Sequence, residues 1–475
     1  MQYNNAKLWQ IAFFSLNNFA TNLYLAMMAY VSYYANGVAG FGVVLVSILL
    51  TALNVFDGIT DPIAGFFLDK MNGKYGKFRP FMLIGNLLMS GCVFLLFFVT
   101  HHIPGGLRLI WFVLTYMGFI IGYTLQTVVG KSGQTVLTNN PKQRPISTYF
   151  DSLYVMAAYG GIALYVSNYL VKKYGRLNSG GLFMEFAAVV ILVSFLATLL
   201  AILGIREKDR KEFFYESEKK QEIRLRDYKE ILFYNRPIAM LIIAACTDKF
   251  AATVYSHTTV GVMLFGIMMQ DYRIAGLIGV VTALPTLLIV TLGIRLAQNV
   301  GQKKTLVTFT IAGILLQVAM LFLLNREDVS RIRFSFSSIN GITVAFFCLF
   351  VLLNGCKSIT NNMVIPMIAD CSDYEVYRSG KYVPGLMGAL FSFVDKIFTA
   401  LGTGFVGLMV AGIGFSKRLP QISDPLTGKM KALTLFLYCG TPIIGWILTL
   451  IAMRFYHLDH HQMKRIQEVN LTRRK

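Results

Sequence analysis

Residues 41–68 read FGVVLVSILLTALNVFDGITDPIAGFFL, an apolar run whose charged residues all lie in its second half. A helix needs roughly 20 apolar residues to cross hydrocarbon about 30 Å thick, so this run is long enough to span a membrane. Its two acids, Asp57 and Asp61, stand four residues apart. Because residues at this spacing share one face of a helix, the run predicts a membrane helix with two neighbouring carboxylates.

The composition of the whole chain is that of a membrane protein. Of its 475 residues, 55% are hydrophobic and only 14% are charged, whereas soluble domains average about 25% charged residues. A water-soluble enzyme of this size is therefore excluded. Apolar runs of spanning length occur at residues 8–34, 41–68, 80–100, 107–130, 147–171, 181–205, 237–268, 274–298, 304–325, 338–369, 385–414 and 432–455.

The runs fall into two groups of six, separated by a charged stretch from Arg206 to Arg236. A basic, glycine-marked turn follows the second run of each group, which is typical of a duplicated transporter bundle. We therefore expect an all-α membrane protein with 12 transmembrane helices in two six-helix bundles. Its parts would be an N-terminal bundle, a cytoplasmic connecting loop, a C-terminal bundle and a cytoplasmic tail, at residues 1–205, 206–236, 237–456 and 457–475.

The net charge of +20 indicates how the chain is oriented. With the termini inside, 29 of the 44 Lys and Arg residues fall in inner segments and 12 in outer loops, as the positive-inside rule requires. We expect a multi-pass protein of the plasma (inner) membrane with both termini cytoplasmic. The connecting loop also carries eight acids, so it is not a basic patch for nucleic acid.

Sequence motifs for catalysis and for metal binding are missing. There is no GxxxxGK[ST], HExxH or GxSxG motif, the six cysteines show no CxxC spacing, and the six histidines show no convincing metal spacing. We expect no enzyme activity and no cofactor.

The acids of the second run are candidates for a cation site, because ionisable groups in membrane helices are costly and commonly functional. Asp57 and Asp61 repel each other unless a cation or a proton lies between them, and Thr60 lies on the same stretch. Pro62 frees a backbone carbonyl one turn earlier. Asp57 and Asp61 are thus predicted to bind Na⁺ or H⁺; the alternative is structural ion pairing with lysines of other helices.

The eleventh run carries a polar stripe that includes Ser392, Asp395 and Lys396. We expect Lys396 to neutralise Asp57 or Asp61 when the cation is absent, which would couple cation binding to movement of the two halves. The alternative is a permanent surface pair of Asp395 with Lys396, although adjacent residues point about 100° apart on a helix.

Uncharged amides on the first run are candidates for substrate binding. Asn18 and Asn22 are aligned with Ser15 on one helical face, and carboxamides both donate and accept hydrogen bonds, as sugar hydroxyls do. The alternative is hydrogen bonding between helices.

Asp151 and Tyr154 on the fifth run and Gln126 on the fourth are further candidates for the substrate site. Asp151 lies about one turn into its apolar run, so it is either a cavity carboxylate or an acid at the membrane interface. The roles of Lys131, Lys249 and Lys357 stay open.

The string Asp57-Gly58-Ile59-Thr60-Asp61-Pro62, followed by Gly76-Lys77-Phe78-Arg79-Pro80, resembles the signature of the glycoside–pentoside–hexuronide:cation symporters of the major facilitator superfamily. Further segments resemble the same family in the same order along the chain, namely Asn140–Arg144, Ala369–Glu375 and Asp395-Lys396.

The resemblance implies the major facilitator fold, alternating access, and sugar uptake driven by Na⁺, Li⁺ or H⁺. Asp57 and Asp61 match the cation carboxylates of the family and Lys396 its coupling lysine, while Thr60 replaces an asparagine often found there. Asn18 stands where melibiose-type members have an acid, so an α-galactoside held in the same pose is not expected.

The predicted function is cation-coupled symport of a sugar, glycoside or hexuronide into the cell. The expected partners are that small molecule, a monovalent cation and membrane lipid, with the monomer as the functional unit. One alternative is a major facilitator carrier of a lipid or another amphipathic solute. Another is a membrane-embedded enzyme or sensor, for which the sequence has neither a nucleophile–base arrangement nor a large soluble domain.

Overall fold

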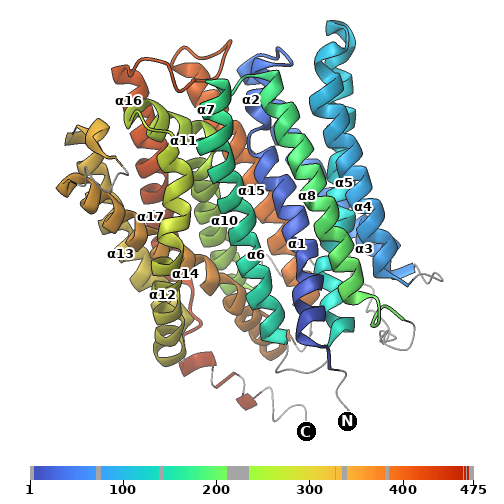
Figure 1. The fold of residues 1–475 in the computed structure, drawn as a ribbon. Helices are drawn as coiled ribbons and strands as arrows, with labels where there is room; N and C mark the ends of the chain where they lie inside the picture. Colours follow the sequence, from blue (N-terminus) through green and yellow to red (C-terminus); the bar gives the residue numbers. More distant parts are fainter. Residues whose placement is uncertain are drawn as a thin grey trace. The chain divides into compact units, whose positions relative to one another are not determined.

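The computed structural model describes residues 5–70, 76–138, 144–210, 235–326, 328–333, 340–379, 384–459, 461–463, 465–466 and 468–469. Throughout these residues the regular structure is helical, without a strand (Figure 1). The chain forms two compact units. Unit 1 comprises Met1–Lys219, Ala275–Leu277 and Gly414–Gln421, and unit 2 comprises Lys220–Ile274, Ile278–Ile413 and Ile422–Lys475.

Unit 1 contains six membrane passages, two of which continue through short π-helical turns. They are α1 (Leu8–Met28) with the short α2 (Val31–Gly37), α3 (Val43–Lys70), α4 (Phe78–Phe94) continued to His102, α5 (Gly105–Leu137), α6 (Arg144–Leu164) continued through Leu170 into α7 (Val171–Tyr174), and α8 (Gly180–Ile205).

Unit 2 contains the other six passages. They are α10 (Arg236–Ser256) with α11 (Thr258–Gly261) and the π-helical segment Val262–Met268, α12 (Arg273–Val300), α13 (Gln302–Arg326), α14 (Gly341–Ser379), α15 (Pro384–Gly412), and α16 (Gly428–Leu435) continued through Phe436–Gly440 into α17 (Thr441–Phe455).

Eleven helical stretches of the described chain are long and apolar enough to cross a membrane, judged by length and composition. α1 is the twelfth: its 21 residues give the length, but its polar side chains lower its hydropathy. The predicted all-helical fold with 12 transmembrane helices is therefore confirmed. The first predicted run differs in detail, because α1 ends at Met28 and a separate helix begins at Val31.

Small residues bring the helices of unit 1 into close contact. A Cβ on Gly122 of α5 would lie 2.9 Å from the carbonyl oxygen of Gly85 on α4, and one on Gly204 of α8 would lie 2.7 Å from the backbone nitrogen of Phe14 on α1. Side chains larger than hydrogen would force these helices apart. Close backbone approach of this kind is a common way of packing helices in membranes.

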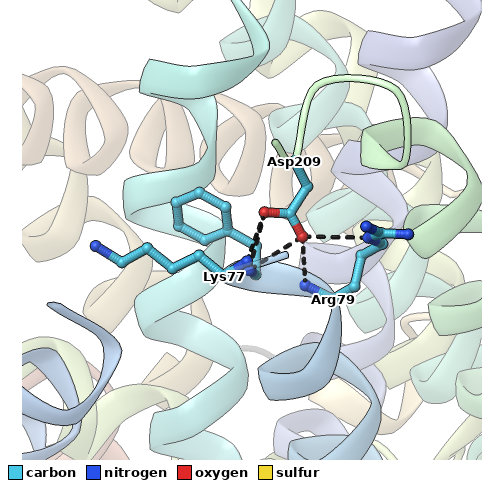
Figure 2. Close-up of polar contacts among 4 residues, drawn as sticks. Lys77, Arg79 and Asp209 are labelled. Atoms are coloured by element: carbon cyan, nitrogen blue, oxygen red, sulfur yellow. Dashed lines mark hydrogen bonds and ion pairs between the residues drawn. The ribbon is translucent and has the colours of Figure 1, made fainter. Parts of the chain in front are cut away.

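A buried carboxylate caps the N-terminus of α4 (Figure 2). Asp209, which follows α8 and is 1% exposed, accepts hydrogen bonds from the backbone N–H groups of Lys77 (2.8 Å), Phe78 (3.1 Å) and Arg79 (3.0 Å). The guanidinium Nε of Arg79 lies 3.3 Å from the same carboxylate. N–H groups at a helix start have no partner within the helix, so Asp209 satisfies three of them and fixes the chain leaving α8.

Unit 2 has a comparable contact at the start of α10. Asn235, fully buried, accepts from the N–H of Ile238 (3.1 Å) and donates to Glu375 of α14 (2.8 Å). Glu375 in turn pairs with Arg378 at 2.7 Å. The two ends of the predicted connecting loop, at Asp209 and Asn235, are thus held by buried polar contacts, each within its own unit. Residues 211–234 lie outside the description.

Candidate functional site

A cavity of about 530 Å³ within unit 1 is lined by α1, α5 and α6. Its polar groups are hydroxyls and carboxamides, with one carboxylate among the lining residues. These residues are Phe14, Ser15, Asn17, Asn18, Thr21, Asn22, Tyr123, Thr127, Gly130, Asp151 and Val155. Such groups pair with a ligand that both donates and accepts hydrogen bonds.

The polar face of α1 faces this cavity, as its spacing predicts. The carboxamide of Asn22 donates to both the side-chain oxygen and the carbonyl of Asn18, each at 2.8 Å. Ser15 is 2% exposed, and its hydroxyl has no hydrogen-bond partner in the described structure. The bonds recorded for Asn18 and Asn22 stay within α1, so the alternative of bonding between helices does not describe them.

Asn17, which the sequence did not single out for the substrate, does bond between helices. It is 1% exposed and donates to the carbonyl oxygen of Gln126 on α5 at 3.0 Å. The side chain of Gln126 is fully buried and donates to Thr198 of α8 at 2.9 Å. The amide of Gln126 thus lies in a contact with α8 and is not part of the cavity lining.

The two candidates on α6 differ in position. Asp151 lines the cavity one turn before Val155, as expected of a cavity carboxylate. Tyr154 packs its ring against Phe19 of α1 (centroids 6.1 Å apart) and Phe150 (6.0 Å), so it supports the packing of α6 on α1. Tyr123 and Thr127, four residues apart, supply the α5 wall; their spacing was the signal available in the sequence.

Oxygen atoms gather where α3 meets α5. The hydroxyl of Thr60 donates to the carbonyl of Asp57 (2.9 Å) and lies 2.9 Å from the hydroxyl of Thr124, which donates to the carbonyl of Ile120 (3.0 Å). Either hydroxyl can donate to the other, and because the two hydroxyls have only two protons for these three contacts, one of the three contacts at a time lacks a proton. The side chain of Asp61 lies outside the description, although α3 continues through it. Among the residues described, no group of three or more His, Cys, Asp or Glu could hold a metal ion.

A second cavity, of about 330 Å³, lies within unit 2 and is lined by α10, α14 and α15. Lys249 and Asp395 form an ion pair there, with 3.0 Å between Nζ and Oδ2. Asp248 also lines this cavity, and its carboxylate accepts from the indole N–H of Trp446 at 2.9 Å. Lys357 places its Nζ 3.4 Å from the centre of the Tyr255 ring, a cation–π contact.

Lys396 follows Asp395 on α15 and is half-buried. Because Asp395 pairs with Lys249 of α10, the acid has a partner on a neighbouring helix. The predicted neutralisation of Asp57 or Asp61 by Lys396 stays a prediction, and the side chains of Ser392 and Lys131 lie outside the description.

Comparison with known proteins identifies relatives that are membrane transporters. The sequence matches the family model of MFS/sugar transport proteins over residues 13–460. It is 24% identical to the uncharacterized symporter YnaJ of Bacillus subtilis (strain 168), covering 95% of this chain and 92% of that one. It is 25% identical to the glucuronide carrier protein homolog of Escherichia coli (strain K12), covering 95% and 93%. The isoprimeverose transporter of Lactiplantibacillus pentosus is 23% identical, with 98% and 92% covered.

Solved structures share the fold. A bacterial homologue of the iron transporter ferroportin aligns with a TM-score of 0.61 at 13% identity, covering 94% of this chain and 100% of that one. A D-xylose-proton symporter aligns with a TM-score of 0.59 at 12% identity, covering 93% and 96%.

The twelve helices and the match to the family model define a membrane transporter with the major facilitator fold, not an enzyme. The chain belongs to the MFS/sugar transport protein family, and within the major facilitator superfamily to the glycoside–pentoside–hexuronide:cation symporters that its Asp57–Pro62 signature resembles.

Proposed function

We propose that the protein takes up a sugar or glycoside together with a monovalent cation by alternating access. The observation that carries this proposal is the cavity of unit 1, where α1 presents Ser15, Asn18 and Asn22 to a space of about 530 Å³. Hydroxyl and carboxamide groups in a membrane helix are costly unless they meet a ligand, water or one another. The names of the relatives, which include an isoprimeverose transporter and a glucuronide carrier homolog, support a sugar as that ligand.

In this proposal the sugar contacts Asn18, Asn22 and Asp151, and Ser15 and Thr127 join them because they line the same cavity. Gln126 and Tyr154 are given a packing role on the strength of their contacts with Thr198 and with Phe19. Ser392 and Lys396 are kept as candidates from the sequence.

The cation, Na⁺ or H⁺ with Li⁺ also considered, would bind at Asp57 and Asp61 with Thr60. The contacts of Thr60 add Thr124 and the carbonyl of Asp57 to this group. Hydroxyl and carbonyl oxygens suit a hard cation, since such ions prefer oxygen ligands. Lys396 would neutralise the carboxylates when the cation leaves.

We further propose that both termini are cytoplasmic and that the monomer is the transporting unit.

A lipid or drug carrier on the same fold is the second candidate. It would need a mainly apolar cavity, whereas seven of the eleven residues that line the cavity of unit 1 carry a hydroxyl or a carboxamide. This chemistry favours a hydroxylated ligand over an amphipathic one.

The test is accumulation by membrane vesicles from expressing cells, with a panel of labelled sugars and glycosides and an imposed gradient of Na⁺ or H⁺. We expect uptake against a gradient by the wild type, and loss of that accumulation in Asp57→Asn. Glu185→Gln is the matched control, because it removes an acid paired with Lys173 at 2.7 Å outside both cavities. Accumulation by Asp57→Asn at the wild-type level would refute the cation site, and a wild type that accumulates no panel member would refute the function.

A further inference from the structure

The cavity of unit 2 contains polar groups to which the proposed function assigns no role. Asn361 and Asn362 lie near the middle of the 39-residue α14, where both are exposed and line the cavity. Among the described residues, neither carboxamide has a hydrogen-bond partner. Polar groups at the middle of a membrane helix face the interior of the bundle or a water-filled space, so these two amides are available to a ligand that enters the cavity.

The ion pair beside them is only partly enclosed. The side chains of Lys249 and Asp395 are 36% and 49% exposed. An ammonium group has three donors and a carboxylate has about four acceptor positions, so their mutual contact leaves most of this capacity unused. Phe391 supplies an apolar wall to the same cavity. Donors, acceptors and an aromatic surface together match the hydroxyls and the C–H face of a sugar ring.

The charges of the cavity do not favour an anion. Its lining holds two acids, Asp248 and Asp395, against one base, Lys249. Lys357 contacts the Tyr255 ring, with 3.4 Å between Nζ and the ring centre, so Lys249 is the cation that an entering carboxylate would meet. Lys249 is already paired with Asp395, so a carboxylate entering the cavity would have to displace Asp395 from Lys249 while lying close to it. Juxtaposed like charges strongly disfavour a partner.

We propose that this cavity is a carbohydrate subsite of unit 2, in which the Lys249–Asp395 ion pair selects an uncharged sugar over a hexuronate. The inference rests on the proposed function, since it names the class of sugar that the transporter takes. A neutral ring hydrogen-bonds to both members of the intact pair and to Asn361 and Asn362. A hexuronate would do so only at the expense of the pair.

Binding to the purified full-length protein in nanodiscs tests this selection. The probes are 4-nitrophenyl glycosides in matched pairs, glucoside with glucuronide and galactoside with galacturonide, as both anomers and with Na⁺ present. In the wild type we expect the neutral member of a binding pair to bind at least about tenfold more tightly than its acid. Asp395→Asn frees Lys249 for the uronate, so this preference should fall by about tenfold or reverse.

Two controls separate the ion pair from a general loss of charge. The double variant Lys249→Gln/Asp395→Asn removes the freed cation, so uronide binding should be no tighter than in the wild type. Glu185→Gln breaks the Lys173–Glu185 pair of unit 1 and should leave the preference unchanged. If Asp395→Asn does not fold, Asn361→Leu and Asn362→Leu test the subsite, and we expect each to weaken neutral-sugar binding about tenfold at an unchanged melting temperature.

The outcomes distinguish this inference from the function on which it rests. If the wild type binds a uronide as tightly as the matched neutral glycoside, the proposed selection of uncharged sugars is wrong, but the proposed transport function is unaffected. Both asparagine variants binding the neutral sugar with wild-type affinity overturns the subsite. If no member of the panel binds or is transported, the proposed function falls, and the inference with it.

Discussion

The cap that Asp209 provides on α4 leads to a prediction that can be worked out atom by atom. Asp209→Ala removes the acceptor of three backbone N–H groups at 2.8–3.1 Å and the partner of the Arg79 guanidinium. Replacing a capping residue by alanine typically costs about 0.5–2 kcal/mol, and a hydrogen bond to a charged group contributes about 1.5–3 kcal/mol. Because the site is buried and these contributions do not add fully, we expect the free energy of opening of the first turn of α4 to fall by about 2–4 kcal/mol.

Amide hydrogen exchange of Lys77, Phe78 and Arg79 measures this loss locally, because protection reports the free energy of opening. A loss of about 2–4 kcal/mol corresponds to exchange that is roughly 30- to 1000-fold faster, at about 1.4 kcal/mol per factor of ten. Asp209→Asn keeps one acceptor oxygen and should lie between alanine and the wild type. Asp328→Ala is the control, since Asp328 is an exposed acid that accepts from Ser330 in unit 2. Exchange at residues 77–79 that is less than threefold faster in Asp209→Ala would refute the reasoning.

Three further predictions concern packing and the two proposed ligands. Gly122→Ala should lower the melting temperature, because the added Cβ would lie 2.9 Å from the carbonyl of Gly85, whereas Gly161→Ala should not, because its Cβ would meet nothing within 4 Å; equal effects would contradict the close helix contact. Asn17→Ala should destabilise the folded protein by about 0.6–2 kcal/mol, because it loses the bond to α5, whereas Asn18→Ala should weaken sugar binding. Thermal unfolding measures the first effect and binding calorimetry the second. The reverse pattern would disprove the assignment of Asn17 to packing and Asn18 to the sugar. Thr124→Val should raise the cation concentration needed for half-maximal uptake several-fold, and unchanged cation dependence would remove Thr124 from the site.

The helices were predictable from the sequence because each depends on a local property. A run of apolar residues long enough to cross the bilayer forms a helix wherever it lies in a membrane, and the residues on one face follow from the helical period. The polar face of α1 was predictable for the same reason: Ser15, Asn18 and Asn22 repeat at helical spacing and line the cavity together.

The partners of individual side chains were not predictable in this way. Gln126 and Thr127 are neighbours in the sequence, yet one bonds to Thr198 and the other lines the cavity. Periodicity relates residues within one helix but does not say which face meets a cavity. Lys249 and Asp395 come from α10 and α15, and nothing in either segment alone indicates the other.

The polarity of α1 has a consequence for how the protein is made. α1 is synthesised before the other eleven helices described, and it falls short of the hydropathy that they reach. Its main packing partner within unit 1, α8, is synthesised about 150 residues later, which takes roughly 8–30 s at about 5–20 residues per second. During that interval α1 lacks its contact with α8. We therefore expect the packing of α1, the least hydropathic of the twelve helices, to be completed only when the sixth helix of its bundle is synthesised.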